Sequence, residues 1–142
     1  MSNSPTIVFD IDGTLANCEH RIHWVRSTPK NWPAFNRGMK RDTAHEDIVW
    51  MLRTFHAAGC TILIASGRSE DERAVTEAWL RDIAGIGDLY AQLYMRASKD
   101  YRSDDIVKSE ILDHMRAFQR DQQAWFRVAE ASIDNFMSKQ KF

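Results

Sequence analysis

The chain has 142 residues, of which 44% are hydrophobic and 27% charged, and its net charge at pH 7 is -1. These values are typical of one globular domain, so we expect residues 1–142 to form a single domain. They exclude a general attraction to nucleic acid or membranes, and no apolar run approaches the roughly 20 residues that span a bilayer. Two distant cysteines, Cys18 and Cys60, form neither a disulfide framework nor a zinc spacing, which favours a reduced, cytoplasmic location.

The first predicted element is a buried strand over Thr6–Asp10, which ends in a cluster of polar residues. Asp10 and Asp12 stand one residue apart, followed by a glycine and Thr14. Carboxylates are costly beside buried strand residues unless a cation or hydrogen bonds hold them. The layout suits a nucleophile at Asp10 and a neighbouring acid and base at Asp12, with Thr14 donating to a phosphate oxygen. The alternative is that both acids only shape a turn.

The next stretch is unusually basic. From His20 to Arg41 there are six Arg or Lys residues and no Asp or Glu, with three large aromatic residues interleaved. We therefore expect residues 17–42 to form a short flap, inserted after the first strand, that faces an anion and stacks on nucleobases. The alternative is a packed insertion whose aromatic residues are core and whose charges are solvated.

Predicted helices and strands alternate from Thr43 to Met95. The predicted elements are a helix over Thr43 to about Ala58 with a capping box at Thr43–Glu46, a strand over Thr61–Ala65, a helix over Glu70 to about Ala84, and a strand over Ala91–Met95. This alternation predicts an α/β fold with a central parallel sheet. The continuous apolar strands indicate that helices cover both faces of the sheet.

The second strand is also followed by polar residues, Ser66, Gly67 and Arg68. Because the carboxyl ends of parallel strands meet at one edge, we expect these residues and the two acids after the first strand to share a crevice. Ser66 and backbone N–H groups can donate to phosphate oxygens, and Arg68 can bind an oxyanion bidentately. The alternative is a plain turn into the next helix.

A third group of charged residues opens a helix predicted from Ser103 to about Phe118. Asp104 and Lys108 are four residues apart and share a helix face. Such a pair is most often a surface ion pair that contributes little. A functional interpretation needs Lys108 to point into the crevice and hold Asp10 and a phosphoryl group.

Together these motifs resemble the haloacid dehalogenase (HAD) superfamily, with the run from Asp10 to Thr14 as its first motif, Ser66 as its second and Lys108 as its third. The resemblance implies a Rossmann-like three-layer sandwich, Asp10 as nucleophile and Asp12 as acid and base. It also implies Mg²⁺ as cofactor, held by the Asp10 carboxylate and the Asp12 backbone carbonyl. The insertion after the first strand is short, so we expect no large cap domain and an open site.

A narrower resemblance rests on FDIDGTLAN followed by His20 and Arg21, on ILIASGRSEDER and on DYRSDDIVKSEIL. These segments are similar to the 3′-phosphatase domain of phage-type polynucleotide kinase/phosphatase. The likeness implies that Arg21, Gly67 and Asp104 join the other phosphate-binding residues. It implies a Mg²⁺-dependent phosphomonoesterase that acts through an aspartyl-phosphate on polynucleotide 3′ ends, with a phosphorylated nucleic-acid end or a nucleotide as partner. A nucleotidase or small-metabolite phosphatase, and a non-catalytic HAD-like binding module, are the alternatives.

The segment 119–142 is ambiguous. A helical stripe would comprise Trp125, Ala129, Ile133 and Phe136, whereas Phe126–Ile133 could instead form a fourth strand that ends at Asp134 and Asn135. The fourth motif of the family is a pair of acids after a strand. Asp134 is the nearest match and the expected third metal ligand, with a neutral Asn135 beside it. The alternative is that Asp134 is an ordinary surface residue and another acid, such as Asp121, serves instead.

Overall fold

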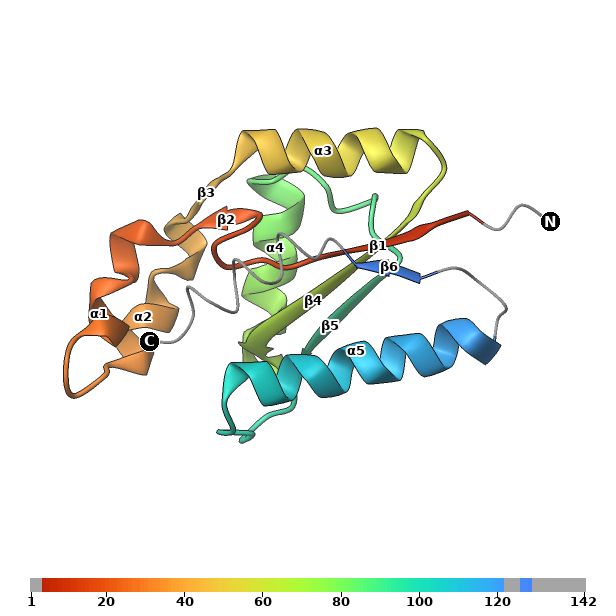
Figure 1. The fold of residues 1–142 in the computed structure, drawn as a ribbon. Coiled ribbons are helices and arrows are strands. Elements are labelled where there is room, and N and C mark those ends of the chain that lie inside the picture. Colours follow the sequence, from red (N-terminus) through yellow and green to blue (C-terminus); the bar gives the residue numbers. More distant parts are fainter. Residues whose placement is uncertain (1–3, 122–125, 129–142) are drawn as a thin grey trace.

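A computed structural model describes residues 4–121 and 126–128 and shows a central parallel sheet (Figure 1). The strand order is β5–β4–β1–β6, with all neighbours parallel. The strands are β1 (Thr6–Phe9), β4 (Thr61–Ser69), β5 (Gln92–Arg96) and β6 (Phe126–Val128). The strand alternative for the tail is therefore confirmed for Phe126–Val128. Asp134 and Asn135 lie outside the described residues.

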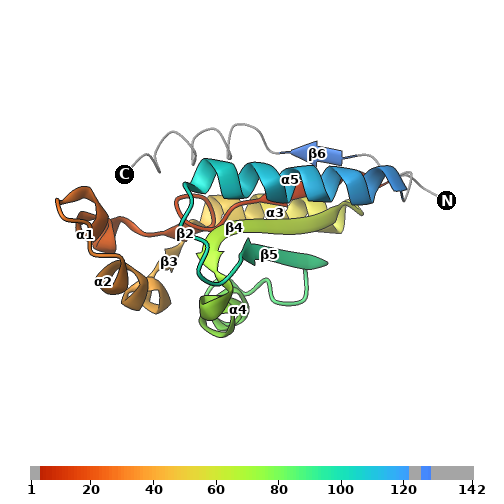
Figure 2. The same ribbon diagram turned by 90° about the horizontal axis from the view of Figure 1, so that it is seen from below.

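Side chains of β1 alternate between two hydrophobic cores. Ile7 and Phe9 pack with α3 (Glu46–Ala57) and α4 (Arg73–Asp82), whereas Val8 packs with α5 (Asp104–Asp121). Figure 2 shows α5 on one side of the sheet and α4 on the other. The predicted three-layer α/β sandwich, with helices covering both faces, is confirmed.

The predicted capping box at the start of α3 is wrong. The N-cap residue is His45, which makes no side-chain cap hydrogen bond, and the helix begins at Glu46. Thr43 and Ala44 instead form β3, which pairs antiparallel with β2 (Ala16–Asn17). This short ribbon closes the base of the insertion. Because Thr43 is paired with Asn17 in the ribbon, it is not available to cap the helix.

The predicted helix over Glu70 to about Ala84 is shorter in the structure, because Glu70–Glu72 form η3 and Ile83 is the C-cap residue of α4. The buried residues of α4 are Thr76, Trp79 and Leu80, which share one helix face, and Ile83 is exposed. The Trp79 indole N–H donates to the backbone carbonyl of Asp42 at 2.8 Å. This hydrogen bond links the buried face of α4 to the end of the insertion.

The insertion projects from the edge where β1 and β4 end (Figure 1). It contains η1 (Glu19–Arg21), α1 (His23–Arg26), α2 (Trp32–Arg37) and η2 (Met39–Arg41). A small core of its own includes Phe35 and Val25, while Trp24 and Trp32 remain 40% and 45% exposed. The flap is thus partly a packed insertion, and no large cap domain occurs in the part of the chain that is described.

Two further findings concern the cysteines and the helices. Cys18 and Cys60 are both free thiols. Among the described residues, no helix combines the length and the apolar character needed to cross a bilayer.

Candidate active site

Asp10, Asp104 and Lys108 meet at the carboxyl end of β1. Asp10 directly follows the strand and is 2% exposed. The Lys108 ammonium lies 3.1 Å from Asp10 Oδ1, 3.2 Å from Asp10 Oδ2 and 3.0 Å from Asp104 Oδ2. Lys108 is itself buried, so the Asp104–Lys108 pair is part of the crevice and not a surface ion pair.

Burial strongly affects the acidity of Asp10. Removal from water raises the pKa of Asp10 from 3.8 to about 7, and the nearby charges of Asp12 and Asp104 act in the same direction. Lys108 opposes them. A carboxylate must be ionised to act as a nucleophile, so this site gains from any further cation that favours the charged form.

Asp12 is held by two arginines. Arg68 binds it with two bonds, Nη2 to Oδ1 at 2.7 Å and Nε to Oδ2 at 3.1 Å, and Arg21 Nη2 donates to Oδ1 at 2.7 Å. Burial alone would raise the pKa of Asp12, but the guanidinium groups of Arg68 and Arg21 outweigh it and hold that pKa far below its usual value. Asp12 is therefore an anion in this arrangement.

A residue that sequence reasoning missed, Asp42, links the same two arginines. Its carboxylate is buried and accepts from Arg21 Nε at 2.7 Å, from Arg21 Nη2 at 2.6 Å and from Arg68 Nη2 at 3.3 Å. His20 Nε2 lies 2.7 Å from Asp42 Oδ1. The one signal in the sequence was its position as the first acid after the basic stretch that ends at Arg41.

The charges of the site balance before any ligand enters. Four carboxylates face four cations, and Arg96 joins the group by donating to Asp104 Oδ1 at 3.1 Å. The members are Asp10, Asp12, Asp42, Asp104, Arg21, Arg68, Arg96 and Lys108. A bound phosphate dianion would add two negative charges to this neutral group, and a divalent cation would neutralise them.

The polar residues after Ala65 belong to a strand and not to a plain turn. β4 continues to Ser69, with an irregular register relative to β5 between Ala65 and Ser69. The buried Ser66 hydroxyl accepts from the Arg68 backbone N–H at 3.1 Å. Thr14 is also buried, in the turn after Asp12. Of the two hydroxyls predicted to bind phosphate, that of Thr14 thus lies in the turn after β1, and that of Ser66 lies in the last part of β4.

Gly67 has a packing role at this point. A Cβ atom there would overlap Asp104 Oδ1 and would lie 2.8 Å from Asp104 Cγ. The Gly67 carbonyl accepts from Arg96 Nε at 2.8 Å. Only a residue without a side chain lets the Asp104 carboxylate approach the strand this closely.

The site residues fit Mg²⁺. Asp10 Oδ1 is buried and lies 3.1 Å from Lys108 Nζ, but it accepts no well-oriented hydrogen bond, so it can still offer a lone pair to a hard cation. Over residues 4–121 and 126–128, no group of three or more His, Cys, Asp or Glu side chains forms a metal site. Mg²⁺ commonly needs only one or two carboxylates, because waters and substrate oxygens complete its shell. Of the predicted ligands Asp10, Asp12 and Asp134, the last lies outside the described part.

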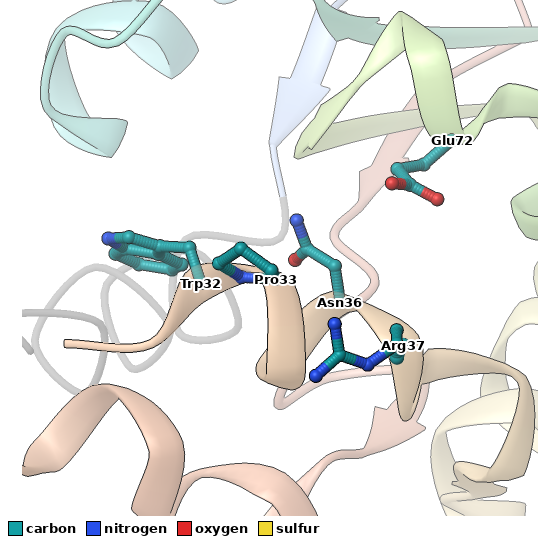
Figure 3. A pocket seen from close by; sticks show the side chains of 5 residues that line it. All are labelled: Trp32, Pro33, Asn36, Arg37 and Glu72. Carbon is teal, nitrogen blue, oxygen red and sulfur yellow. The ribbon is translucent and has the colours of Figure 1, made fainter.

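A pocket of about 430 Å³ opens beside this site (Figure 3). Its walls are Trp32, Pro33, Asn36 and Arg37 of α2 and, from η3 (Glu70–Glu72) opposite, Glu72. The Phe35 carbonyl in the same helix accepts from Arg21 Nη1 at 3.3 Å, and Arg21 in turn binds Asp12. One arginine therefore connects the pocket wall with the carboxylates.

The three-layer sandwich, with two acids after its first strand and an inward-pointing lysine, defines a phosphatase of the haloacid dehalogenase type. The family described as polynucleotide kinase PNKP phosphatase domain matches residues 4–117. The chain belongs to this family. No curated protein matches the sequence at a significant level.

Solved structures show the same fold at low sequence identity. A chain of a Pnkp1/Rnl/Hen1 complex is 22% identical over 90% of this chain, with a TM-score of 0.62. A chain of the Pnkp1/Rnl/Hen1 RNA repair complex is 22% identical over 89%, also at 0.62. The class C acid phosphatase from Bacillus anthracis, solved with tungstate bound, is 16% identical over 80%, at 0.58. These alignments cover 46%, 42% and 48% of those chains, so this chain spans less than half their length.

Proposed function

We propose that this domain removes phosphate from the 3′ ends of polynucleotides in a Mg²⁺-dependent reaction that passes through an aspartyl-phosphate on Asp10. The observation that carries the proposal is the contact of the Lys108 ammonium with Asp10, at 3.1 and 3.2 Å, beside an Asp12 bound by two arginines. This arrangement places a buried carboxylate nucleophile beside a fixed cation, Lys108, with two arginines close by on Asp12. Fixed cations at these positions offset part of the repulsion when one anion attacks another.

In the first step, a carboxylate oxygen of Asp10 bonds to phosphorus as the bond from phosphorus to the 3′ oxygen breaks. Asp12 gives a proton to that leaving oxygen. In the second step, a water oxygen bonds to the phosphorus of the aspartyl-phosphate as the bond from phosphorus to the Asp10 oxygen breaks, and Asp12 takes up one proton of that water. Inorganic phosphate leaves, and Asp10 returns to its starting state.

Asp12 must carry a proton at the start of the first step, and its contacts with the two arginines oppose this. With Arg21 and Arg68 bound, the low pKa of Asp12 keeps it unprotonated, as the second step requires. A phosphate group offers the same guanidinium N–H donors a competing acceptor and adds negative charge beside Asp12. Both effects raise the pKa of Asp12 towards the range of a proton donor. The predicted role of Arg68 and Arg21 in binding phosphate thus supports the acid role of Asp12.

The Asp10 carboxylate and the backbone carbonyl of Asp12 would hold Mg²⁺, with Asp134 proposed as a third ligand. When bound, the ion would polarise the phosphoryl oxygens and offset the charge of the incoming dianion. The neutral balance of the site without substrate supports this assignment, as does Asp10 Oδ1, which accepts no well-oriented hydrogen bond.

The family and the open site support a polynucleotide end as the substrate. Residues 1–142 would form a single phosphatase domain, and its partner would be a phosphorylated nucleic-acid end or a nucleotide. The free thiols of Cys18 and Cys60 support a reduced, cytoplasmic location.

The test is the release of inorganic phosphate from a 3′-phosphorylated oligonucleotide, with Mg²⁺ and with EDTA. A 5′-phosphorylated oligonucleotide and a nucleoside monophosphate separate end specificity from a nucleotidase activity. Asp10→Asn should lower kcat/KM by about 10³-fold or more, the scale seen when a covalent nucleophile is removed. Asp113→Asn, on an exposed part of α5, is the matched control and should leave the rate unchanged. Equal rates for wild type and Asp10→Asn would exclude the mechanism.

A further inference from the structure

The basic residues of the insertion are mostly exposed. Five of its six basic residues are exposed, and none of these five forms an ion pair within residues 4–121 and 126–128: Arg26, Lys30, Arg37, Lys40 and Arg41. By contrast, several exposed or half-buried arginines outside it are paired, as in Arg73 with Glu70 and Arg102 with Glu110. A group of such cations next to a phosphatase site favours a ligand that carries several negative charges.

A partly exposed aromatic side chain lies close to one of these cations. Trp32 is 45% exposed, its ring meets Phe35 edge-on at 5.7 Å, and Lys30 Nζ lies 5.8 Å from the ring centroid. Its contact with Phe35, a core residue of the insertion, supports the indole. A partly exposed aromatic ring beside a cation is a combination that binds single-stranded nucleic acid, because bases stack while phosphates pair with charge.

The pocket chemistry indicates which part of such a ligand enters it. Trp32 and Pro33 offer apolar surface, and Asn36 offers an amide that can both donate and accept. Glu72 faces α2 from the other wall (Figure 3) and would repel a phosphate, whereas it can accept from a base N–H or a sugar hydroxyl. The volume of about 430 Å³ lies in the range of small-ligand sites. Arg37 also lines the pocket and can pair with a phosphate, so the lining as a whole suits a nucleoside together with its attached phosphate.

We infer that the insertion is a binding site for single-stranded polynucleotide, with a nucleoside in the Trp32–Glu72 pocket and backbone phosphates on the five exposed cations. The inference rests on the proposed function for the position of the strand, whose 3′ phosphate would lie at Asp10. Arg21 gives that position a physical basis, because it contacts both the pocket helix, at the Phe35 carbonyl, and Asp12. Stacking and ionic contacts would hold the strand regardless of its sequence.

The test measures binding directly, by fluorescence anisotropy of labelled single-stranded DNA and RNA of about eight nucleotides without a 3′ phosphate. Trp32→Ala should weaken binding by about 5- to 150-fold, the range for loss of one stacked base, and Trp32→Phe should restore most of it. Trp50→Ala is the matched control, because Trp50 is 68% exposed on α3, outside the pocket. Equal binding by Trp32→Ala and Trp50→Ala would overturn the inference.

Salt dependence gives a second, independent measurement. Removal of one cation that binds a phosphate should reduce the slope of log affinity against log salt by about 0.7 for a single strand. Arg37→Ala and Lys40→Ala should each lower the slope, whereas Arg81→Ala, already paired with Asp82, should not. A slope unchanged in both insertion variants would overturn the inference.

The two proposals can fail separately. If the labelled strands bind through Trp32 but no 3′ phosphate is released, the proposed function fails and the binding site stands. The opposite outcome is that nucleoside 3′-phosphates are hydrolysed while the Trp32→Ala variant binds the labelled strands as tightly as the wild type does. In that case the proposed binding site on the insertion is wrong, and the proposed phosphatase function stands.

Discussion

Replacement of Asp42 by alanine tests the charge network around Asp12. The Arg21 guanidinium is 1% exposed and donates to Asp42 from Nε at 2.7 Å and from Nη2 at 2.6 Å. Without Asp42, a buried cation loses two short charge-assisted hydrogen bonds and keeps only one carboxylate partner among the described residues, Asp12. Breaking a buried ion pair by removing one partner lowers stability by about 3–5 kcal/mol. We expect Asp42→Ala to lower the unfolding free energy by that amount.

The assay is urea denaturation at pH 7, with the midpoint and slope fitted for each variant. Asp82→Ala is the control, since Asp82 pairs with Arg81 at 2.8 Å but both side chains are well exposed. Water screens an exposed pair of this kind, so it contributes little to stability. If Asp42→Ala lost no more stability than Asp82→Ala, the Arg21–Asp42 contacts would not hold the insertion against the sheet, and the reasoning would be refuted.

Three other predictions concern the crevice. Lys108→Met removes the cation that lowers the pKa of Asp10, so the acid limb of the pH–rate profile should move to higher pH; an unmoved limb would contradict this role of Lys108. Gly67→Ala should displace Asp104 and lower kcat/KM by about tenfold or more, and a rate within about twofold of wild type would show that the strand yields instead. For metal-free protein, the folded pKa of Asp10 near 7 exceeds its unfolded value of 3.8, so the stabilising contribution of this group is complete below about pH 4 and is lost as the pH rises through 7. The free energy of unfolding from urea denaturation should therefore fall over this range by up to about 4 kcal/mol, and a fall of equal size in Asp10→Asn would contradict the assignment to Asp10.

Strand topology allowed much of the site to be predicted from sequence. Asp10, Asp12 and Arg68 follow or extend neighbouring parallel strands, and the carboxyl ends of such strands share one edge. Their convergence depended only on the order of strands and helices. The spacing of Asp104 and Lys108 also showed that they share a helix face, but burial of the lysine depended on how α5 packs.

Asp42 could not be found in this way, because its position depends on how the insertion folds. It lies between η2 and β3 and belongs to no apolar period or motif. Its contacts arise because β3 pairs with β2 and because the Trp79 indole donates to the Asp42 carbonyl. Ile83 is exposed for another reason, since α4 ends at Asp82 and Ile83 is its C-cap residue. Long-range contacts place Asp42, and local sequence patterns do not encode them.

The insertion and Asp12 are physically linked through Arg21. Arg21 lies 4.1 Å from the Phe35 ring centroid, donates to the Phe35 carbonyl, and binds both Asp12 and Asp42. The packing that orders the base of α2 thus fixes the guanidinium that lowers the pKa of Asp12. A shift of α2 that lengthened the Arg21–Asp12 contact would raise that pKa, since a cation near a carboxylate favours its ionised form. A short insertion, far smaller than a cap domain, can therefore influence the proton chemistry at Asp12 through a single buried arginine.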